Sequence, residues 1–312
     1  MNARPATTRL PTLPRVERRE LRIAVLAPPW IPVPPLGYGG IEAVVALTCE
    51  GLVARGHEVT LFAAPGSHSA AHMHSPLQGT HADQIGSSVY ESDHVGAAYD
   101  AIENAASEDR PFDVLHDHSG FTAVAMAHRL SVPVVHTLHA PFNDEMRPFY
   151  TRHGHKVRLV AISRFQLEHA PPGVGVADVV PNPIRVEDWP FCEDKDDYLL
   201  WMGRMDAAKG AASEIVIHGE NGFLLADEQA MAEAVGRLDA IGPLRCRESV
   251  ASRYNVTIVA EGYESVYDRA IQAAASQGPR FVRRVQSVSR WNDRAERVMP
   301  GAARASTLQP TG

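Results

Sequence analysis

The chain has 312 residues, 45% of them hydrophobic, which is enough to build two globular domains of ordinary size. Its 37 acidic and 30 basic side chains leave a formal charge of -7, which disfavours a nucleic-acid binder because phosphate binding depends on clustered Lys and Arg. The three cysteines are far apart and form no C-x-x-C pair, so neither a disulfide framework nor a zinc knuckle is supported. No apolar run is long enough to cross a membrane, and the first 20 residues lack the apolar stretch of a signal peptide. We therefore expect a cytoplasmic protein that acts on small molecules, with no integral membrane segment.

The first ordered part of the chain alternates predicted strands with predicted helices. Short apolar runs predict strands over 21–27, 59–63, 113–116, 133–138 and 158–162. Apolar residues at helical spacing predict helices over 41–55, 95–107 and 120–130. This βαβ alternation predicts an α/β fold with a doubly wound parallel sheet, in which ligands bind at the carboxyl ends of the strands.

The rest of the sequence predicts a second, smaller part. Residues 1–20 are expected to be a disordered tail, 21–185 an N-terminal Rossmann-like domain that binds the acceptor, 186–275 an incomplete second Rossmann-like domain, and 276–312 a disordered Arg-rich tail. Around 170–197 we expect an interdomain linker, followed by a strand over 198–203 and helices over 227–241 and 258–274. The last helix is expected to cross back onto the N-terminal domain.

Several segments in the first 185 residues carry a family resemblance. Segment 27–42, which ends in Gly39-Gly40-Ile41-Glu42, and segment 51–59, Gly-Leu-Val-Ala-Arg-Gly-His-Glu-Val, resemble the opening of glycosyltransferase family 4, a GT-B fold. Further matches to the family's order are 113–118 (Asp-Val-Leu-His-Asp-His), 136–139 (His-Thr-Leu-His), 160–163 (Val-Ala-Ile-Ser) and 180–184 (Val-Pro-Asn-Pro-Ile). The resemblance implies a transferase that moves a hexose from a nucleotide-diphosphate sugar to a hydroxyl acceptor with retention and needs no cofactor. The acceptor would rest on the N-terminal domain and the donor on the second domain.

The second domain matches the family only at its two ends. Segment 203–210 resembles the start of the family's donor-binding domain, and segment 214–224 resembles a part near its end. The three or so βα units that the family carries between them, on the order of 100 residues, are absent, and with them the pair of glutamates that contacts the donor. The sequence therefore leaves two hypotheses open, an active glycosyltransferase and a catalytically inactive remnant that binds an acceptor or a partner.

Gly39 and Gly40 stand between the first strand and the first helix. Glycines at this place let backbone N–H groups at the helix N-terminus approach an anion, so both are predicted to bind the donor. The spacing is not G-x-G-x-x-G, which disfavours a dinucleotide dehydrogenase. Glu42, in the first helical turn, is predicted on the acceptor side, although a carboxylate there also complements the helix dipole. Ser163 and Asn182 are interpreted as capping and turn residues.

Two cations follow the predicted strand of the second domain. Arg204 and Lys209 lie in a G-R-M-x-x-x-K-G context and are predicted to bind the donor. As the glycosidic bond of the donor breaks, negative charge grows on the diphosphate, and fixed cations stabilise it more in the transition state than in the ground state. Such a site requires no metal.

Four histidines and one carboxylate cluster at the ends of two predicted strands: His116, Asp117, His118, His136 and His139. Three interpretations remain open. A zinc site needs three converging ligands, and we expect His116 and His118 to point to opposite faces. Alternatively, the rings are hydrogen-bonded at the strand ends. The family resemblance implies instead that His139 is an active-site residue near the transferred sugar, with Asp117 as a second catalytic residue and His118 on the acceptor side.

Overall fold

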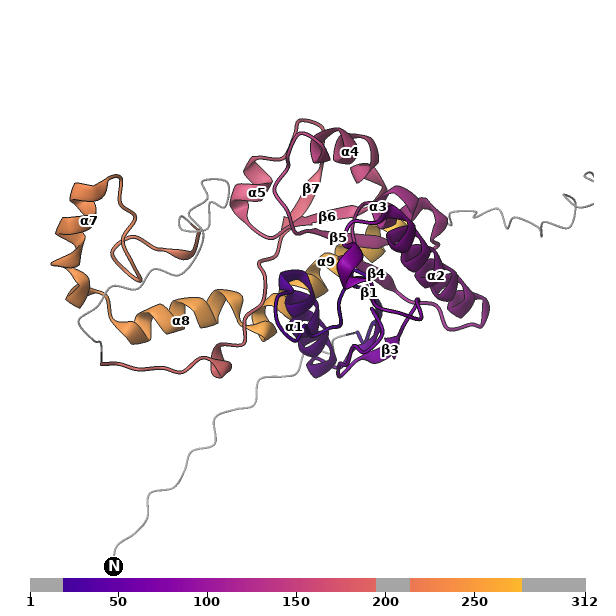
Figure 1. Ribbon diagram of the computed structural model, residues 1–312, viewed down its shortest axis with the longest axis horizontal. Helices are drawn as coiled ribbons and strands as arrows, with labels where there is room; N and C mark the ends of the chain where they lie inside the picture. Colours follow the sequence, from indigo (N-terminus) through magenta and orange to yellow (C-terminus); the bar gives the residue numbers. More distant parts are fainter. Residues whose placement is uncertain (1–18, 195–213, 277–312) are drawn as a thin grey trace, which may run out of the picture. The chain divides into compact units, whose positions relative to one another are not determined.

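A computed structural model describes residues 19–194 and 214–276, and within them seven strands form one sheet (Figure 1). The strands are β1 Arg22–Leu26, β2 Glu58–Phe62, β3 His72–His74, β4 Val114–Asp117, β5 Val134–Leu138, β6 Arg158–Ala161 and β7 Val176–Val179. Their order is β3-β2-β1-β4-β5-β6-β7, and every neighbouring pair is parallel. The direction of winding reverses between β1 and β4. This reversal is the topological switch point at which ligands bind in open α/β sheets.

Helices connect the strands and continue beyond the sheet. The α-helices of the described residues are α1 Gly40–Ala54, α2 Ser88–Ser107, α3 Phe121–Met126, α4 Met146–His153, α5 Arg164–Glu168, α7 Glu228–Val235, α8 Pro243–Tyr254 and α9 Val256–Ser276. None of the helices in this described part is long and apolar enough to cross a membrane.

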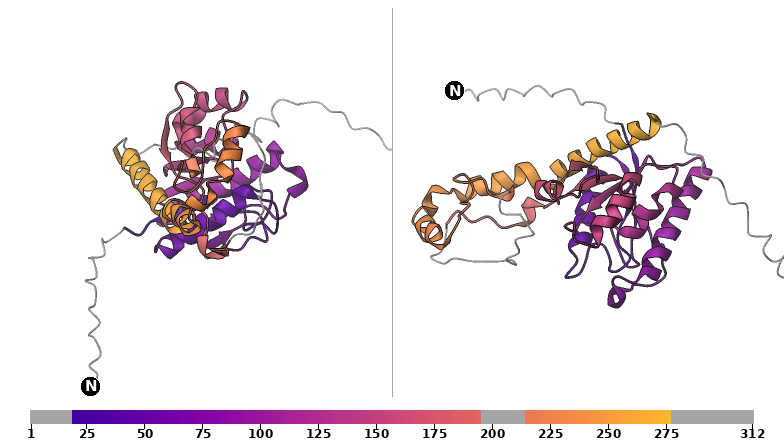
Figure 2. Two further views of the ribbon diagram at one scale, coloured as in Figure 1. Left: turned by 90° about the vertical axis from the view of Figure 1, so that its left-hand side faces the viewer. Right: turned by 90° about the horizontal axis from the view of Figure 1, so that it is seen from above.

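Both faces of the sheet are buried, which explains the continuous apolar runs of its central strands. Along β1, Ile23 and Val25 pack with α1 and α9 on one face, whereas Ala24 and Leu26 pack with α2 and α3 on the other. Figure 2 shows α9 and α2 on opposite sides of the strands. This is the doubly wound α/β architecture that the sequence predicts.

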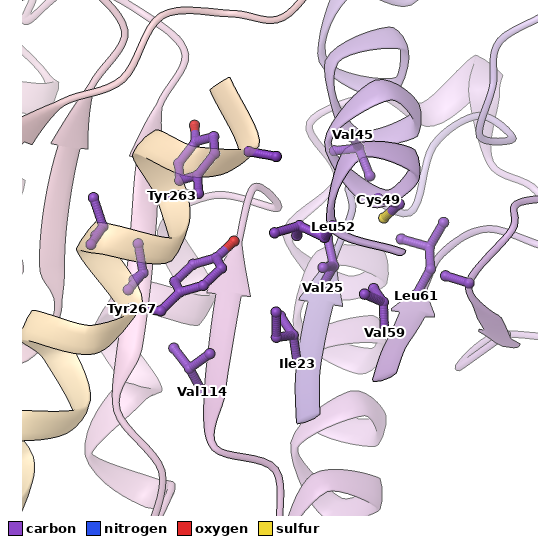
Figure 3. Packing of buried hydrophobic residues seen from close by; sticks show 14 of the residues in the cluster. Ile23, Val25, Val45, Cys49, Leu52, Val59, Leu61, Val114, Tyr263 and Tyr267 are labelled. Carbon is purple, nitrogen blue, oxygen red and sulfur yellow. The ribbon is translucent and has the colours of Figure 1, made fainter. Parts of the chain in front are cut away.

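Helix α9 returns to the N-terminal sheet, as predicted. Tyr263 and Tyr267 are fully buried and belong to the same hydrophobic cluster as β1 and β4. Figure 3 shows both rings on α9, with that of Tyr267 beside Val114 of β4. The two helices on this face approach closely, because Gly51 of α1 presents no side chain to Val256 and Ala260 of α9.

Several predicted boundaries were wrong, and two strands were overlooked. β3 pairs with β2 at the sheet edge, but all its residues are exposed, so a polar stretch gave no strand signal. β7 lies within the segment interpreted as a linker and is only partly buried. α2 begins seven residues before the predicted start. Its first buried residue is His94, so the turns before it give no apolar signal. α8 was not predicted, because none of its residues is buried and it has no apolar face against the core.

Part of the predicted second domain lies outside the described residues. The strand expected at 198–203 is such a part. Nearly all of the two tails expected at 1–20 and 276–312 also lies outside the described residues. The described residues 214–276 contain helices and a turn closed by a 2.8 Å hydrogen bond from the amide of Gly219 to the carbonyl of Gly222, but no strand that pairs into a sheet. The predicted helix over 227–241 ends earlier as α7, followed by a short 3-10 turn.

Candidate functional site

The candidate site lies at the carboxyl ends of β1, β4 and β5, beside the switch point. The chain that leaves β4 is tied to the end of β1 by a 2.9 Å hydrogen bond from the amide of His118 to the carbonyl of Leu26. Two of the loops that begin here lead to the N-termini of α1 and α3. The topology therefore brings the predicted residues of segments 39–42, 117–118 and 136–139 to one edge of the sheet.

Asp117 is fully buried and anchors a chain of three side chains. Asp117 and His136 are partners in the register of β4 and β5, and the Asp117 carboxylate accepts a 2.5 Å hydrogen bond from His136 Nδ1. The Tyr150 hydroxyl of α4 lies 3.0 Å from His136 Nε2. The other carboxylate oxygen accepts from the amide and the hydroxyl of Ser119 at 2.9 and 2.7 Å. Because both oxygens are engaged, Asp117 orients its neighbours and is shielded from solvent.

His116 points to the opposite face and connects the site to α9. Its Nε2 lies 2.8 Å from the Thr137 hydroxyl, and its Nδ1 lies 2.7 Å from the hydroxyl of Tyr267. Thr137 in turn contacts the hydroxyl of Tyr263 at 3.0 Å. All four side chains are buried, so α9 is joined by hydrogen bonds to the strand that carries Asp117.

His118 and His139 form a second pair. His118 Nδ1 and His139 Nε2 are 2.8 Å apart, and the rings are stacked with centroids 5.0 Å apart. The prediction that His116 and His118 point to opposite faces was wrong, because their ring centroids are only 4.0 Å apart. Residues two apart on an extended chain share a face, and His118 directly follows β4, so the two rings lie on the same side. His118 is 2% exposed, whereas His139 is partly exposed.

Burial keeps these rings neutral. It lowers the pKa of His139 to about 3, with the nearby His136 adding to the effect and Asp117 opposing it. It also holds the pKa values of His116 and His118 well below their usual range, and neighbouring histidines lower them further. Among the described residues, no group of three or more His, Cys, Asp or Glu side chains is arranged to hold a metal ion.

The N-terminus of α1 is formed by the predicted glycines. A Cβ atom on Gly39 would lie 2.6 Å from Cβ of Pro35 and 2.7 Å from Cδ1 of Ile31, so only glycine fits there. A Cβ atom on Gly40 would meet nothing within 4 Å, and no side-chain hydrogen bond caps this helix. Glu42 is 6% exposed, and burial raises the pKa of its carboxyl group, against a smaller lowering by its own backbone. The helix end thus combines a first turn without a side-chain cap with a carboxyl group that loses its charge more readily than usual.

The remaining predicted residues are Arg204, Lys209, Ser163 and Asn182. Arg204 and Lys209 lie outside the described residues, so their placement against the sheet stays a prediction. Ser163 caps α5, as predicted, by accepting a 3.0 Å hydrogen bond from the amide of Gln166. The prediction that Asn182 is a capping or turn residue was wrong, since its buried side-chain oxygen has no hydrogen-bond partner in the described part of the chain.

Sequence reasoning overlooked four residues that hold the site together, namely Thr137, Tyr150, Tyr263 and Tyr267. The two tyrosines of α9 are four residues apart, which is a helical-face signal that predicts a shared packing surface. Nothing in the sequence indicates that this surface meets the histidine of β4.

Comparisons with known proteins support the fold. Residues 38–188 match the family model described as Glycosyltransferase Family 4, and no curated protein matches the sequence. The sucrose-phosphate synthase of Thermosynechococcus elongatus superposes with a TM-score of 0.55 and 14% identity, over 82% of this chain and 100% of that chain. AviGT4, a glycosyltransferase involved in avilamycin A biosynthesis, gives a TM-score of 0.49 and 17% identity, with 81% and 98% covered. Anabaena Alr3699/HepE, in complex with UDP-glucose, gives 0.48 and 12%, with 80% and 100% covered.

Proposed function

We propose that the chain, whose residues 38–188 match the model of Glycosyltransferase Family 4, transfers a hexose from a nucleotide-diphosphate sugar to a hydroxyl acceptor, with retention at the anomeric carbon. The observation that carries this proposal is the position of the partly exposed His139 at the switch point of a GT-B-type sheet, held there by the buried His118. In the reaction, the bond from the anomeric carbon to the diphosphate breaks, a bond to the acceptor oxygen forms, and the proton of the acceptor hydroxyl passes to the departing diphosphate.

The neutral ring of His139 suits a hydrogen-bonding role. A general base works best when its pKa lies near the working pH, and a pKa of about 3 makes this imidazole a weak base at neutral pH. Asp117 is no better placed, because it is buried with both oxygens engaged. We assign His139 to binding the transferred sugar and Asp117 to positioning the residues around it.

The N-terminus of α1 is assigned to the charged end of the donor. The uncapped first turn after Gly39 and Gly40 offers N–H groups and a partial positive charge to a phosphate. Glu42, in the same turn, has a carboxyl pKa that burial raises, so it suits a hydrogen bond to an acceptor hydroxyl. Arg204 and Lys209 complete the proposed donor site from the second domain.

A second candidate function is a binding module without transfer activity. One observation favours it: in the described residues 214–276, helices and a turn replace the sheet that a donor domain needs. Large apolar side chains there are exposed, among them Met231 at 54% and Leu244 at 51%. We infer that an internal deletion has removed the units that would cover these side chains.

Donor binding and product formation separate the two candidates. A bound nucleotide sugar stabilises the folded state, and a concentration about ten times Kd raises the free energy of unfolding by about 1.4 kcal/mol. For the transferase we expect millimolar UDP- or GDP-hexose to raise Tm and to release nucleotide diphosphate in the presence of an acceptor. The His139→Gln variant should lose both effects, whereas the surface variant His155→Gln should keep them.

A chain in which the missing βα units are restored provides the comparison. If only the restored chain shifts in Tm and releases nucleotide, the binding-module interpretation holds. If neither chain responds to any nucleotide sugar, the proposed donor site at the sheet edge is wrong.

A further inference from the structure

The pair His118–His139 has a hydrogen bond whose direction determines what His139 offers to a ligand. The bond joins Nδ1 of His118 to Nε2 of His139 at 2.8 Å. Burial lowers the pKa of both rings, so each carries one proton, and only one of the two facing nitrogens can be the donor. The proton's position on one ring therefore fixes its position on the other.

The remaining two nitrogens lie in different surroundings. His118 Nε2 is buried and has no hydrogen-bond partner in the described part of the chain. His139 is partly exposed, and its Nδ1 is not among the buried atoms that lack a partner. The outer nitrogen of His139 can thus reach solvent or a ligand, whereas that of His118 cannot.

These surroundings distinguish the two arrangements. If His139 donated from Nε2, the proton of His118 would sit on its buried Nε2, and that N–H group would have no acceptor. Orphaned buried N–H groups are rare in folded proteins, because leaving a buried donor unpaired costs its full desolvation. If His118 donates from Nδ1, both protons have an acceptor: one is bonded to His139 Nε2, and the other, on His139 Nδ1, faces solvent.

We propose that His118 is a positioning residue that donates its Nδ1–H to His139 Nε2 and so fixes His139 as a hydrogen-bond donor through Nδ1–H. Resting on the proposed function, this deepens it: His139 offers its N–H to an oxygen of the nucleotide sugar or of the acceptor, and does not accept a proton from either. The ring of His136 is held by the carboxylate of Asp117, whereas the ring of His139 is held by the neutral imidazole of His118.

Nitrogen-15 NMR of the full chain, labelled at histidine, tests the proposal directly. Protonated and unprotonated imidazole nitrogens have distinct chemical shifts, so the tautomer of each ring is observable, and the His139→Gln variant identifies the His139 signals by their loss. We expect His139 to be protonated at Nδ1 and unprotonated at Nε2 near neutral pH. The opposite tautomer in the unsubstituted protein would overturn the proposal.

Two variants test the role of His118 itself. In His118→Asn the side-chain amide nitrogen takes the place of Nδ1 and keeps a donor, so the tautomer of His139 should be unchanged. In His118→Leu the donor is lost, and protonation at His139 Nε2 should appear. His155→Leu, an exposed histidine outside the pair, serves as the control and should leave the His139 signals in place.

An unchanged tautomer in His118→Leu would refute the positioning role. If His118→Leu does not fold, the spectra of the unsubstituted protein and of His118→Asn still decide the question. None of these readouts depends on sugar transfer, so a failure of the proposed function would be seen separately.

Discussion

The hydrogen bond between Tyr267 of α9 and His116 of β4 can be tested by removing one oxygen atom. Tyr267→Phe keeps the ring that packs against the sheet and deletes only the hydroxyl, which lies 2.7 Å from His116 Nδ1. Both residues are fully buried, so no water replaces the lost partner. Leaving a buried polar group unsatisfied costs about 1–3 kcal/mol, and we expect the free energy of unfolding to fall by that amount.

Thermal unfolding followed by circular dichroism measures this loss. In a domain of 150–250 residues, 1 kcal/mol corresponds to about 2–4 °C in Tm, so Tyr267→Phe should lower Tm by about 2–12 °C. Tyr254→Phe is a matched control on α8, because its hydroxyl lies 3.5 Å from the carbonyl of Glu214, at the limit of a hydrogen bond. Its expected change is below about 0.5 kcal/mol. Equal Tm values for the two variants would refute a stabilising role of the contact with His116.

Two further predictions concern pH and helix packing. The pKa values of His94 and His139 are lowered to about 4 and about 3 from 6.5, so the unfolded chain binds more protons below pH 6.5 and the free energy of unfolding must fall as the pH decreases. Each ring contributes up to about 1.4 kcal/mol per pH unit, and urea titrations at pH 7 and pH 5 that give equal stability would contradict this. Gly51→Ala should destabilise the fold by about 1–3 kcal/mol, because its Cβ would lie 2.9 Å from Cγ1 of Val256. Gly40→Ala, with open space around its Cβ, is the control, and a loss of stability as large as that of Gly51→Ala would argue against the close approach of the helices.

The central strands could be predicted from sequence because burial on both faces leaves a local signal. Almost all residues of β1, β4 and β5 are buried, and apolar residues make up most of β1 and β5. β3 leaves no such signal, since it lies at the sheet edge with every side chain exposed and is held by backbone pairing with β2. Helix α8 also leaves no apolar signal in the sequence, because none of its residues is buried. The sequence therefore gives no signal for a strand that pairs through its backbone but buries no side chain.

The candidate site shows a similar division between local and long-range information. Asp117, His118 and His139 were identifiable because polar residues at the ends of apolar strands gather at one edge of a parallel sheet. The partners within the cluster were not identifiable. The contact of Asp117 with His136 depends on the register of two strands, and that of His116 with Tyr267 joins residues 151 positions apart.

Helix α9 completes the core of the N-terminal sheet. Val259, Tyr263, Val266 and Tyr267 are each at most 2% exposed against the sheet. Burying four such side chains contributes roughly 6–12 kcal/mol before entropic costs, which is comparable with the whole stability of a typical domain, about 5–15 kcal/mol. The N-terminal sheet therefore depends on α9 for its core. If transfer needs the βα units that the proposed deletion removes, this fold can persist where transfer activity is lost.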